Sequence, residues 1–355
     1  MNTGIICEFN PFHAGHKYLI DKVKSDGDAV ICVMSGNFVQ RGEMAVFNKA
    51  ERTRLALEGG ADLVIELPTV YATKSAEGFA RAGINLIEAT GIADNFACGA
   101  ECEDANLLYI TAAQIKKHQS DIAKAMKDGL TYPAARRKII NSGILDSPNN
   151  ILALEYIEAS TFLKGKFIKR IGGGHDSDDE KYSASAIRKT LSQDTIVSIT
   201  NCEKAVLAVL RRMSADDFSK IEDVGDGLEN RLYQISKTAT TLEELYDGVK
   251  AKCYTHARIK RIILRAFLGI EKDMYPENPP YLRILGFNDK GKQMLCQMKD
   301  KATLPIVTRT ADIKKLDSDC KKLFELECRC TDLYNLGYKK PLPGNSEQRF
   351  QIVSI

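Results

Sequence analysis

The segment Gly4–His16 reads Gly-Ile-Ile-Cys-Glu-Phe-Asn-Pro-Phe-His-Ala-Gly-His. Its first six residues are mostly apolar and predict a short buried strand, and Asn10–Ala14 predicts a turn. Apolar residues then recur at helical spacing from Gly15 to Lys24. The segment therefore predicts a strand that turns directly into a helix.

Outward from this segment, strands and helices alternate over the first ~190 residues. Further strands are predicted at residues 29–34, 61–67, 95–98 and 166–171, and Asn48 opens a helix with Glu51 three residues later as a capping partner. Near-continuous apolar strands are typical of a parallel sheet that helices cover on both faces. Ligands of such sheets bind at the carboxyl ends of the strands, where Glu8–His16 and Met34–Gly42 are expected to converge.

The pattern changes near residue 195. Residues 203–213, 227–238, 241–252 and 255–268 predict amphipathic helices, and residues 282–287 and 304–308 predict strands. A chain of 355 residues is long enough for two domains. We expect an α/β domain with a Rossmann-like parallel sheet over residues 1–195 and a mostly helical domain over residues 196–355.

Composition excludes several classes of protein. The chain is 44% hydrophobic and 27% charged, as in ordinary globular domains, and its net charge of +3 leaves nucleic-acid binding open. Its ten cysteines lack paired CxxC spacing, so we expect reduced thiols and no cysteine metal site. No apolar stretch approaches the ~20 residues that span a bilayer, and no secretory leader precedes the first strand. These features predict a cytoplasmic protein.

The run His13-Ala14-Gly15-His16 has the chemistry of a phosphate site. The start of a helix offers free backbone N–H groups and a partial positive charge. Gly15 allows phosphate or ribose to approach the backbone closely, and the two imidazoles can donate hydrogen bonds to phosphate oxygens. Transfer of an adenylyl group depends mainly on positioning and charge stabilisation, which such donors supply.

This strand–HxGH–helix element resembles the HIGH-type nucleotidylyltransferase superfamily. Ser183-Ala-Ser-Ala-Ile-Arg188 is similar to the second conserved element of that superfamily, which grips the β- and γ-phosphates of ATP. Its hydroxyls, helix-start amides and guanidinium suit a phosphate ligand. The resemblance implies catalytic roles for His13, His16, Ser185 and Arg188.

A narrower resemblance covers nearly the whole chain. The motifs at 8–16, 33–42, 61–68 and 147–156, and more weakly at 281–287, resemble the tRNA(Met) cytidine acetate ligase family. That family uses ATP to form acetyl-adenylate, releases pyrophosphate, and passes the acetyl group to the wobble cytidine of elongator tRNA(Met). The Gly-rich stretch 172–174 and the acidic stretch 176–180 depart from the family pattern.

The resemblance also implies ligands and residues. It implies ATP as a substrate, acetate and elongator tRNA(Met) as partners, and Mg²⁺ on the pyrophosphate, with metal ligands and oligomeric state left open. The 1–195 domain would be the catalytic one and the 196–355 domain would bind tRNA. The implied ATP-binding residues are Cys7, Glu8, Phe9, Asn10, Pro11, Phe12, His13, Ala14, Gly15, His16, Ile20, Gly99, Asn150 and Arg170.

Place and residue type suggest the remaining candidates. Acetate needs a small pocket with one or two donors, and Asn37, Gln40 and Arg41 follow the second strand. A tRNA must be held by phosphate contacts, which basic segments provide, and its unpaired bases stack on aromatic rings. The tRNA-binding candidates are Arg136, Arg137, Lys252, Tyr254, His256, Arg258, Arg261 and Arg265.

Two other functions share these motifs. One is a small-molecule adenylyltransferase, which would need the first domain but no long helical second half. The other is a non-catalytic RNA-binding protein that retains ATP, against which the intact His13, His16, Ser185 and Arg188 argue. Release of pyrophosphate that depends on acetate would separate the ligase from the adenylyltransferase. Single-turnover acetylation of tRNA(Met), with and without ATP, would separate it from the RNA-binding protein.

Overall fold

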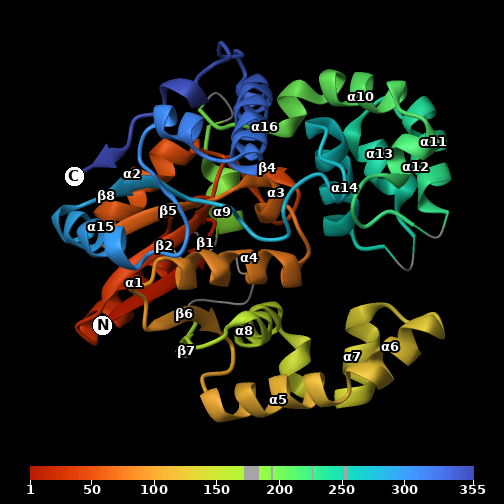
Figure 1. Cartoon of the computed structure of the whole chain (residues 1–355). Coiled ribbons are helices and arrows are strands. Elements are labelled where there is room, and N and C mark those ends of the chain that lie inside the picture. Colours follow the sequence, from red (N-terminus) through yellow and green to blue (C-terminus); the bar gives the residue numbers. More distant parts are fainter. Residues whose placement is uncertain (172–183, 193–194, 226, 252–253) are drawn as a thin grey trace.

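The computed structural model describes residues 1–171, 184–192, 195–225, 227–251 and 254–355. A central sheet has the strand order β10-β8-β5-β2-β1-β6-β7, and β9 adds to β8 (Figure 1). The strands are β1 (Asn2–Cys7), β2 (Ala29–Ser35), β5 (Leu63–Leu67), β6 (Asn95–Ala100), β7 (Lys164–Lys169), β8 (Leu282–Phe287), β9 (Ile306–Val307) and β10 (Val353–Ser354). A separate pair joins β3 (Phe38–Val39) to β4 (Glu43–Met44).

The five strands from the first half of the chain run parallel, as expected for a Rossmann-like sheet. β8 pairs antiparallel with β5, and β10 then pairs parallel with β8. The expected fold class is confirmed, with one antiparallel pairing inside the sheet. Because β1, β2, β6 and β7 are parallel, their carboxyl ends meet at the same edge.

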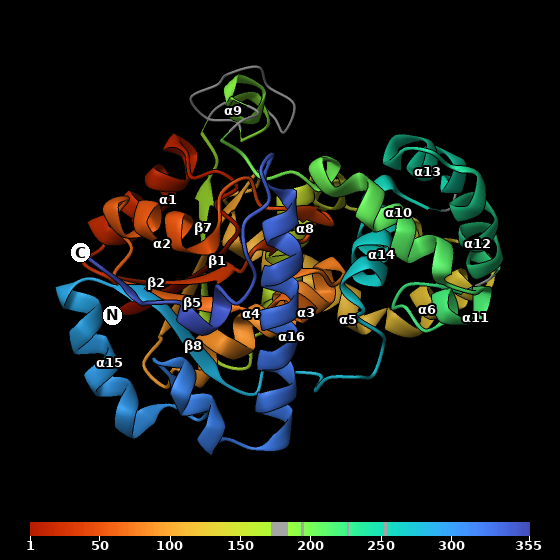
Figure 2. The ribbon, with the colours of Figure 1, turned by 90° about the horizontal axis from the view of Figure 1, so that it is seen from above.

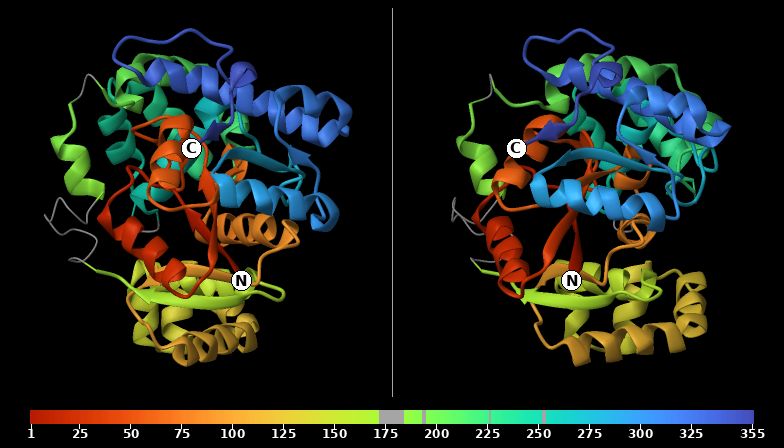
Figure 3. Two further views of the ribbon diagram at one scale, coloured as in Figure 1. Left: turned by 90° about the vertical axis from the view of Figure 1, so that its left-hand side faces the viewer. Right: turned by 60° about the vertical axis from the view of Figure 1, so that its left-hand side comes forward.

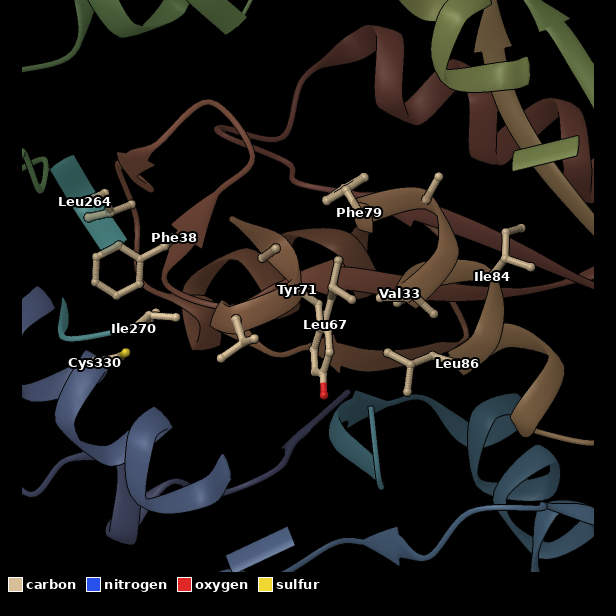
Figure 4. Close-up of a cluster of buried hydrophobic side chains, with 14 of the residues drawn as sticks. Val33, Phe38, Leu67, Tyr71, Phe79, Ile84, Leu86, Leu264, Ile270 and Cys330 are labelled. Atoms are coloured by element: carbon tan, nitrogen blue, oxygen red, sulfur yellow. The ribbon is translucent and has the colours of Figure 1, made fainter. Parts of the chain in front are cut away.

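Helices cover both faces of this sheet. On one face, α1 (Ala14–Ser25) and α2 (Lys49–Glu58) bury Ile20, Val23 and Leu57 against Val30 and Val64. The other face is covered by α3 (Thr69–Ala72) and α4 (Ala76–Ala89), and α8 (Pro148–Ala159) packs beside α4. Figure 4 shows this second core, in which Val33 and Leu67 of the sheet lie near Ile84 of α4.

Two groups of helices extend from the sheet (Figure 1). The first contains α5 (Ala105–Lys117), α6 (Gln119–Lys127) and α7 (Tyr132–Ile140), which connect β6 to α8. The second contains α10 (Glu203–Arg212), α11 (Ala215–Ser219), α12 (Leu228–Thr238), α13 (Leu242–Val249) and α14 (His256–Leu268). Between them in sequence lies α9 (Ala184–Thr190), which stands apart from the sheet in Figure 2.

The last part of the chain differs from the expected second domain. After α14, β8 returns to the sheet, and α15 (Asp289–Lys301) and α16 (Ser318–Tyr334) follow it. Leu282, Ile284 and Leu285 are buried there, since β8 covers what would otherwise be the open edge of β5. Both views of Figure 3 show the C-terminus beside the sheet. The mostly helical region is therefore limited to about α10–α14. The segments before and after it in the sequence both contribute strands to the central sheet.

Two further expectations concern cysteines and membranes. Each cysteine of the described chain is a free thiol, and most are buried, as the sequence predicted. None of the helices that the structure describes combines the length and apolar character that a transmembrane span requires.

Candidate active site

A cavity of about 740 Å³ lies at the carboxyl edge of the parallel strands. Cys7 and Glu8 reach it from the end of β1, Gly99 from β6, and Arg170 from just beyond β7. Its size is that of pockets that enclose a nucleotide-sized ligand. The loops 8–16 and 34–42 meet here as expected, since Gln40 lines the same cavity.

His13 and His16 form the start of α1 in an unusual way. His13 is the N-cap, and its Nδ1 accepts a hydrogen bond from Gly15 N at 3.0 Å. In return, Nδ1 of His16 accepts from His13 N at 3.3 Å. The two rings stack with centroids 3.7 Å apart. Because each Nδ1 accepts a hydrogen bond, a neutral ring carries its proton on Nε2 and can donate from there.

The surroundings keep both rings neutral. Burial, helped by the positive charges of Arg170 and Arg188, lowers the pKa of His13 to about 4. Burial, together with His13 and Arg170, lowers the pKa of His16 well below its usual value. Both side chains line the cavity. At neutral pH the site therefore offers two uncharged N–H donors, which suit phosphate oxygens without a buried imidazolium.

Ser185 and Arg188 approach the same cavity from α9. Arg188 NH1 donates to Asn10 O at 2.7 Å, and its NH2 donates to Ser185 Oγ at 3.1 Å. The guanidinium is thereby tied to the turn that precedes His13. The two sequence elements implied for phosphate binding are at least 169 residues apart in the chain, from His16 to Ser185, and lie against one another. Ser183 and the stretches 172–174 and 176–180 lie outside the described residues.

The opposite wall is made by β6, β7 and α8. Gly99 faces Arg170, and a Cβ at position 99 would lie 3.2 Å from the Arg170 side chain. Arg170 NH1 donates to Asn149 Oδ1 at 3.0 Å, and Asn149 lines the cavity. Asn150 is buried instead, where its Oδ1 accepts from the backbone N–H of Glu101 and of Cys102. Asn150 thus shapes the turn after β6, and its neighbour Asn149 reaches the cavity.

The segment implied for ATP binding divides into lining and supporting residues. Phe9, Asn10 and Gly15 line the cavity with Cys7, Glu8 and the two histidines. Phe9 has a φ of +46°, a rarely populated conformation for a residue with a side chain, and it forms the sharp turn out of β1. Ile20 is fully buried in the core under α1. Pro11, Phe12 and Ala14 shape the turn from outside the lining set.

The acetate candidates separate in a similar way. Gln40 and Arg41 line the cavity. Asn37 does not, which corrects the expectation for that residue. Its Oδ1 accepts from Lys49 N at 3.0 Å and its Nδ2 donates to Thr331 Oγ1 at 3.2 Å, so its side chain is occupied inside the protein. Both Asn37 and Gln40 follow the second strand in the sequence. Their positions alone could not show which side chain lines the cavity and which supports the fold.

The role of Arg52 could not be predicted from the sequence. This residue of α2 is fully buried and donates to backbone carbonyls of Glu8 at 2.6 Å and Ser35 at 3.0 Å, and to Gly36 O and Phe47 O. It therefore fixes the ends of β1 and β2 together, directly under the cavity. An arginine in a predicted amphipathic helix is usually a surface residue, so pattern alone could not identify it.

Most of the basic tRNA candidates prove to be internal, which corrects their expected exposure. Arg136 is buried and paired with Glu155. Arg265 is buried and binds Val70 O at 3.0 Å and Glu222 at 2.9 Å. Arg261 pairs with Asp223, and Arg258 donates to Asp223 O. Helix α14 is buried on nearly all sides from Ile259 to Leu268 and packs into the core, so its arginines stabilise the fold.

Four tRNA candidates remain to be placed. Arg137 is exposed and pairs with Asp146 at 2.9 Å. Tyr254 is half-buried, and the Arg258 guanidinium lies over its ring. Lys252 lies outside the described residues. His256 is exposed at the start of α14 and lines a second cavity of about 750 Å³. This cavity shares Glu43 and Arg188 with the first, so the two adjoin.

No cluster of three metal-ligating side chains occurs in the part of the chain that the structure describes. The acidic stretch 176–180 lies outside that part. Mg²⁺ is commonly bound through one or two carboxylates together with substrate phosphates. A magnesium site in which substrate phosphates supply most of the ligands therefore stays a prediction.

Comparison with known proteins identifies relatives along the whole chain. A family model described as HIGH Nucleotidyl Transferase matches residues 1–206 and 192–349. The tRNA(Met) cytidine acetate ligase of Acetivibrio thermocellus is 36% identical to this chain. The alignment covers 98% of this chain and 97% of that protein. That of Thermoanaerobacter pseudethanolicus is 38% identical, with 95% of each chain covered.

Solved structures give the same result. The apo crystal structure of Thermotoga maritima TmcAL superposes with a TM-score of 0.91 at 28% identity and covers 100% of this chain and 99% of its own. The structure of that protein bound with alpha-thio ATP superposes with a TM-score of 0.89, with the same coverage.

Proposed function

Because the chain belongs to the tRNA(Met) cytidine acetate ligase family, we propose that it acetylates the exocyclic amine of the wobble cytidine of elongator tRNA(Met). ATP and acetate are the other substrates, and AMP and pyrophosphate are released. One observation at the site supports the proposal most directly. Two neutral histidines at the start of α1 line one cavity with Ser185 and Arg188, at the carboxyl edge of the sheet.

In the first step, a carboxylate oxygen of acetate attacks the α-phosphorus of ATP and pyrophosphate leaves. Two anions meet, so donors must offset their repulsion. Nε2–H of His13 and of His16 donates to phosphate oxygens at the start of α1. Ser185 and Arg188 bind the outer phosphates. Mg²⁺, when bound to the phosphates, would offset further negative charge.

Acetate is bound by Gln40 and Arg41, which line the cavity on the side of β2. The adenosine part lies toward Gly99 and Arg170, where β6 and β7 end. In-line attack requires acetate to approach the α-phosphorus from the side opposite the departing pyrophosphate, whose phosphates Ser185 and Arg188 would hold.

The cytidine enters from the second cavity, beside His256. That cavity adjoins the first at Glu43 and Arg188, so a base extruded from the anticodon loop can reach the acetyl-adenylate. Enzymes that modify a base generally bind it unstacked, often against aromatic or histidine rings.

The test uses the purified protein with ATP, labelled acetate and a tRNA(Met) transcript, followed by mass spectrometry of the nucleosides. We expect acetylcytidine at the wobble position only when ATP, acetate and tRNA are all present. Exchange of labelled pyrophosphate into ATP should depend on acetate. Exchange that depends on a nucleoside or nucleotide substrate, in place of acetate, would overturn the proposal in favour of a small-molecule adenylyltransferase.

A substitution tests the role of the histidine pair. His16→Ala should lower acetate-dependent pyrophosphate exchange by about 10²–10³-fold, the effect of removing one donor to a developing charge. Its affinity for tRNA, measured by filter binding, should stay nearly the same. His118→Ala is a matched control, because His118 is exposed and paired with Asp121. Unchanged exchange in His16→Ala would show that the role assigned to this ring is wrong.

A further inference from the structure

Glu8 is an acidic side chain in a cavity that otherwise suits anions. It follows β1 directly and lines the same cavity as His13 and Arg188. Its Oε1 accepts a hydrogen bond from Gln40 N at 2.5 Å. The carboxylate is therefore held in place beside Gln40, at the proposed acetate side of the site.

A carboxylate at this position opposes the binding of both small substrates. ATP and acetate are anions, and like charges repel one another more strongly in a partly buried site than in bulk water. The group must therefore face something else during the reaction, either a cation or an N–H donor. In the proposed reaction, the substrate that brings an N–H group to the reacting atoms is the cytosine. Its exocyclic amine is a donor that glutamate recognises in nucleic acids.

Glu8 and Glu43 both line the cavity, and the partners of these two carboxylates differ. Glu43 Oε1 is 2.6 Å from Lys260 Nζ, so its charge is already compensated. Glu8 forms no ion pair with any described cation, and a backbone N–H orients it. Glu8 is therefore the carboxylate that is better able to accept a proton.

We propose that Glu8 is the general base of acetyl transfer, a role that rests on the proposed function. The cytosine N4 attacks the carbonyl carbon of acetyl-adenylate, so that an N–C bond forms and the bond from that carbon to the phosphate oxygen breaks. AMP leaves with the electron pair of the broken bond. The surplus proton on N4 passes to the Glu8 carboxylate and then to solvent.

The electrostatic surroundings of Glu8 are consistent with this role. Burial raises its pKa, and Glu43 adds to the rise, whereas the Gln40 N–H, Arg41 and Arg52 oppose it. Arg188, Cys7 and Tyr156 also lie within electrostatic range. A carboxylate with a raised pKa holds an accepted proton better than an ordinary surface glutamate does, which makes it a better base once ionised.

The decisive measurement separates the two half-reactions in Glu8→Gln. Acetate-dependent pyrophosphate exchange should be at least as fast as in the wild type, because the substitution removes a negative charge that opposes the binding of ATP and acetate. Single-turnover transfer from preformed acetyl-adenylate to tRNA should fall by about 10²–10⁴-fold, the usual contribution of a general base. In the wild type the transfer rate should rise with pH as Glu8 ionises, and Glu8→Gln should lose this rise.

Two further variants serve as controls. Glu8→Asp retains a carboxylate and should keep the rise with pH at a lower rate, and Glu43→Gln should also keep it. Loss of both half-reactions in Glu8→Gln, relieved by excess Mg²⁺, would assign the residue to metal binding and overturn the proposal. Normal transfer in Glu8→Gln would overturn it as well. If wild-type protein forms acetyl-adenylate but transfers nothing to tRNA, the proposed function fails independently of Glu8.

Discussion

At the scale of single residues, His13 and His16 each use one ring for two tasks. The Nδ1 atoms cap the backbone at the start of α1, in place of the usual serine or aspartate. The same bonds leave the proton of each neutral ring on Nε2, which can then donate to a ligand. Structure and chemistry are thus coupled, because a ring that rotates away from the ligand also uncaps the helix.

The low pKa values of these rings predict a pH-dependent stability. In the unfolded chain His13 takes up a proton below about pH 6.5, whereas in the folded protein its pKa is about 4. Between these values the unfolded state binds more protons, so stability falls as the pH is lowered from 7 to 5. His13→Asn keeps an N-cap but lacks this titration.

We expect the wild type to lose more stability than His13→Asn over this pH interval, by about 1 kcal/mol after allowing for partial exposure. Urea unfolding at pH 7 and pH 5 measures the difference, because titrating groups other than His13 and its stacked neighbour His16 contribute equally to both proteins. Equal losses in the two proteins would contradict a depressed pKa for His13.

The residues of the phosphate-binding motifs could be predicted from the sequence, but the buried side chains that hold them in place could not. A histidine or glycine at a strand–helix junction indicates phosphate binding because spacing along the chain fixes its place. Arg52, by contrast, acts on the ends of β1 and β2 only after α2 has packed on the sheet. Asn37 and Asn150 have suitable chemistry at suitable places, yet their side chains point into the protein.

At the scale of elements, α14 shows that sequence spacing predicts a helix but not which of its side chains are exposed. Its arginines recur at helical spacing, which predicts a basic surface, but nearly every residue from Ile259 to Leu268 is buried. The charged heads reach acidic or carbonyl partners on neighbouring segments, such as Glu222 and Val70 O for Arg265. Sequence spacing predicted the helix correctly and could not reveal what surrounds it.

The start of α14 nevertheless carries an accessible side chain at the second cavity. We expect His256→Ala to raise the KM for tRNA about tenfold, since base stacking contributes about 1–3 kcal/mol per base. Acetate-dependent pyrophosphate exchange should be unaffected, because His256 does not line the first cavity. His118→Ala again provides the matched control. An equal effect of both variants on tRNA would contradict a specific role for His256.

At the scale of the whole molecule, distant parts of the sequence share one core. Strand pairing between β5 and β8 joins residues more than 200 positions apart. Alternating strands and helices predicted the parallel part of the sheet, because each unit there is local. The pairing of β8 with β5, and of β10 with β8, could not be predicted in this way. It depends on β5 offering an open edge, which exists only once the parallel strands have assembled.

A buried group of charged side chains holds the C-terminal segment against the sheet. Lys49 Nζ lies 2.6 Å from Glu66 Oε1 and 2.6 Å from Glu347 Oε1, and Arg283 also pairs with Glu347. These four side chains are at most 4% exposed. Although burial opposes ionisation, Lys49 and Arg283 hold the pKa of Glu347 at about 2. The group links α2, β5 and β8 to the segment after α16.

Removing one partner from this group should be costly. Glu347→Ala leaves Lys49 and Arg283 with Glu66, so a buried positive charge loses its compensation, and we expect a loss of about 3–5 kcal/mol in the free energy of unfolding. Glu325→Ala is the control, since Glu325 is exposed on α16 and should change stability by no more than about 0.5 kcal/mol. Urea denaturation followed by circular dichroism measures both. Equal stability of the two variants would mean that the C-terminal segment does not depend on this group for its attachment.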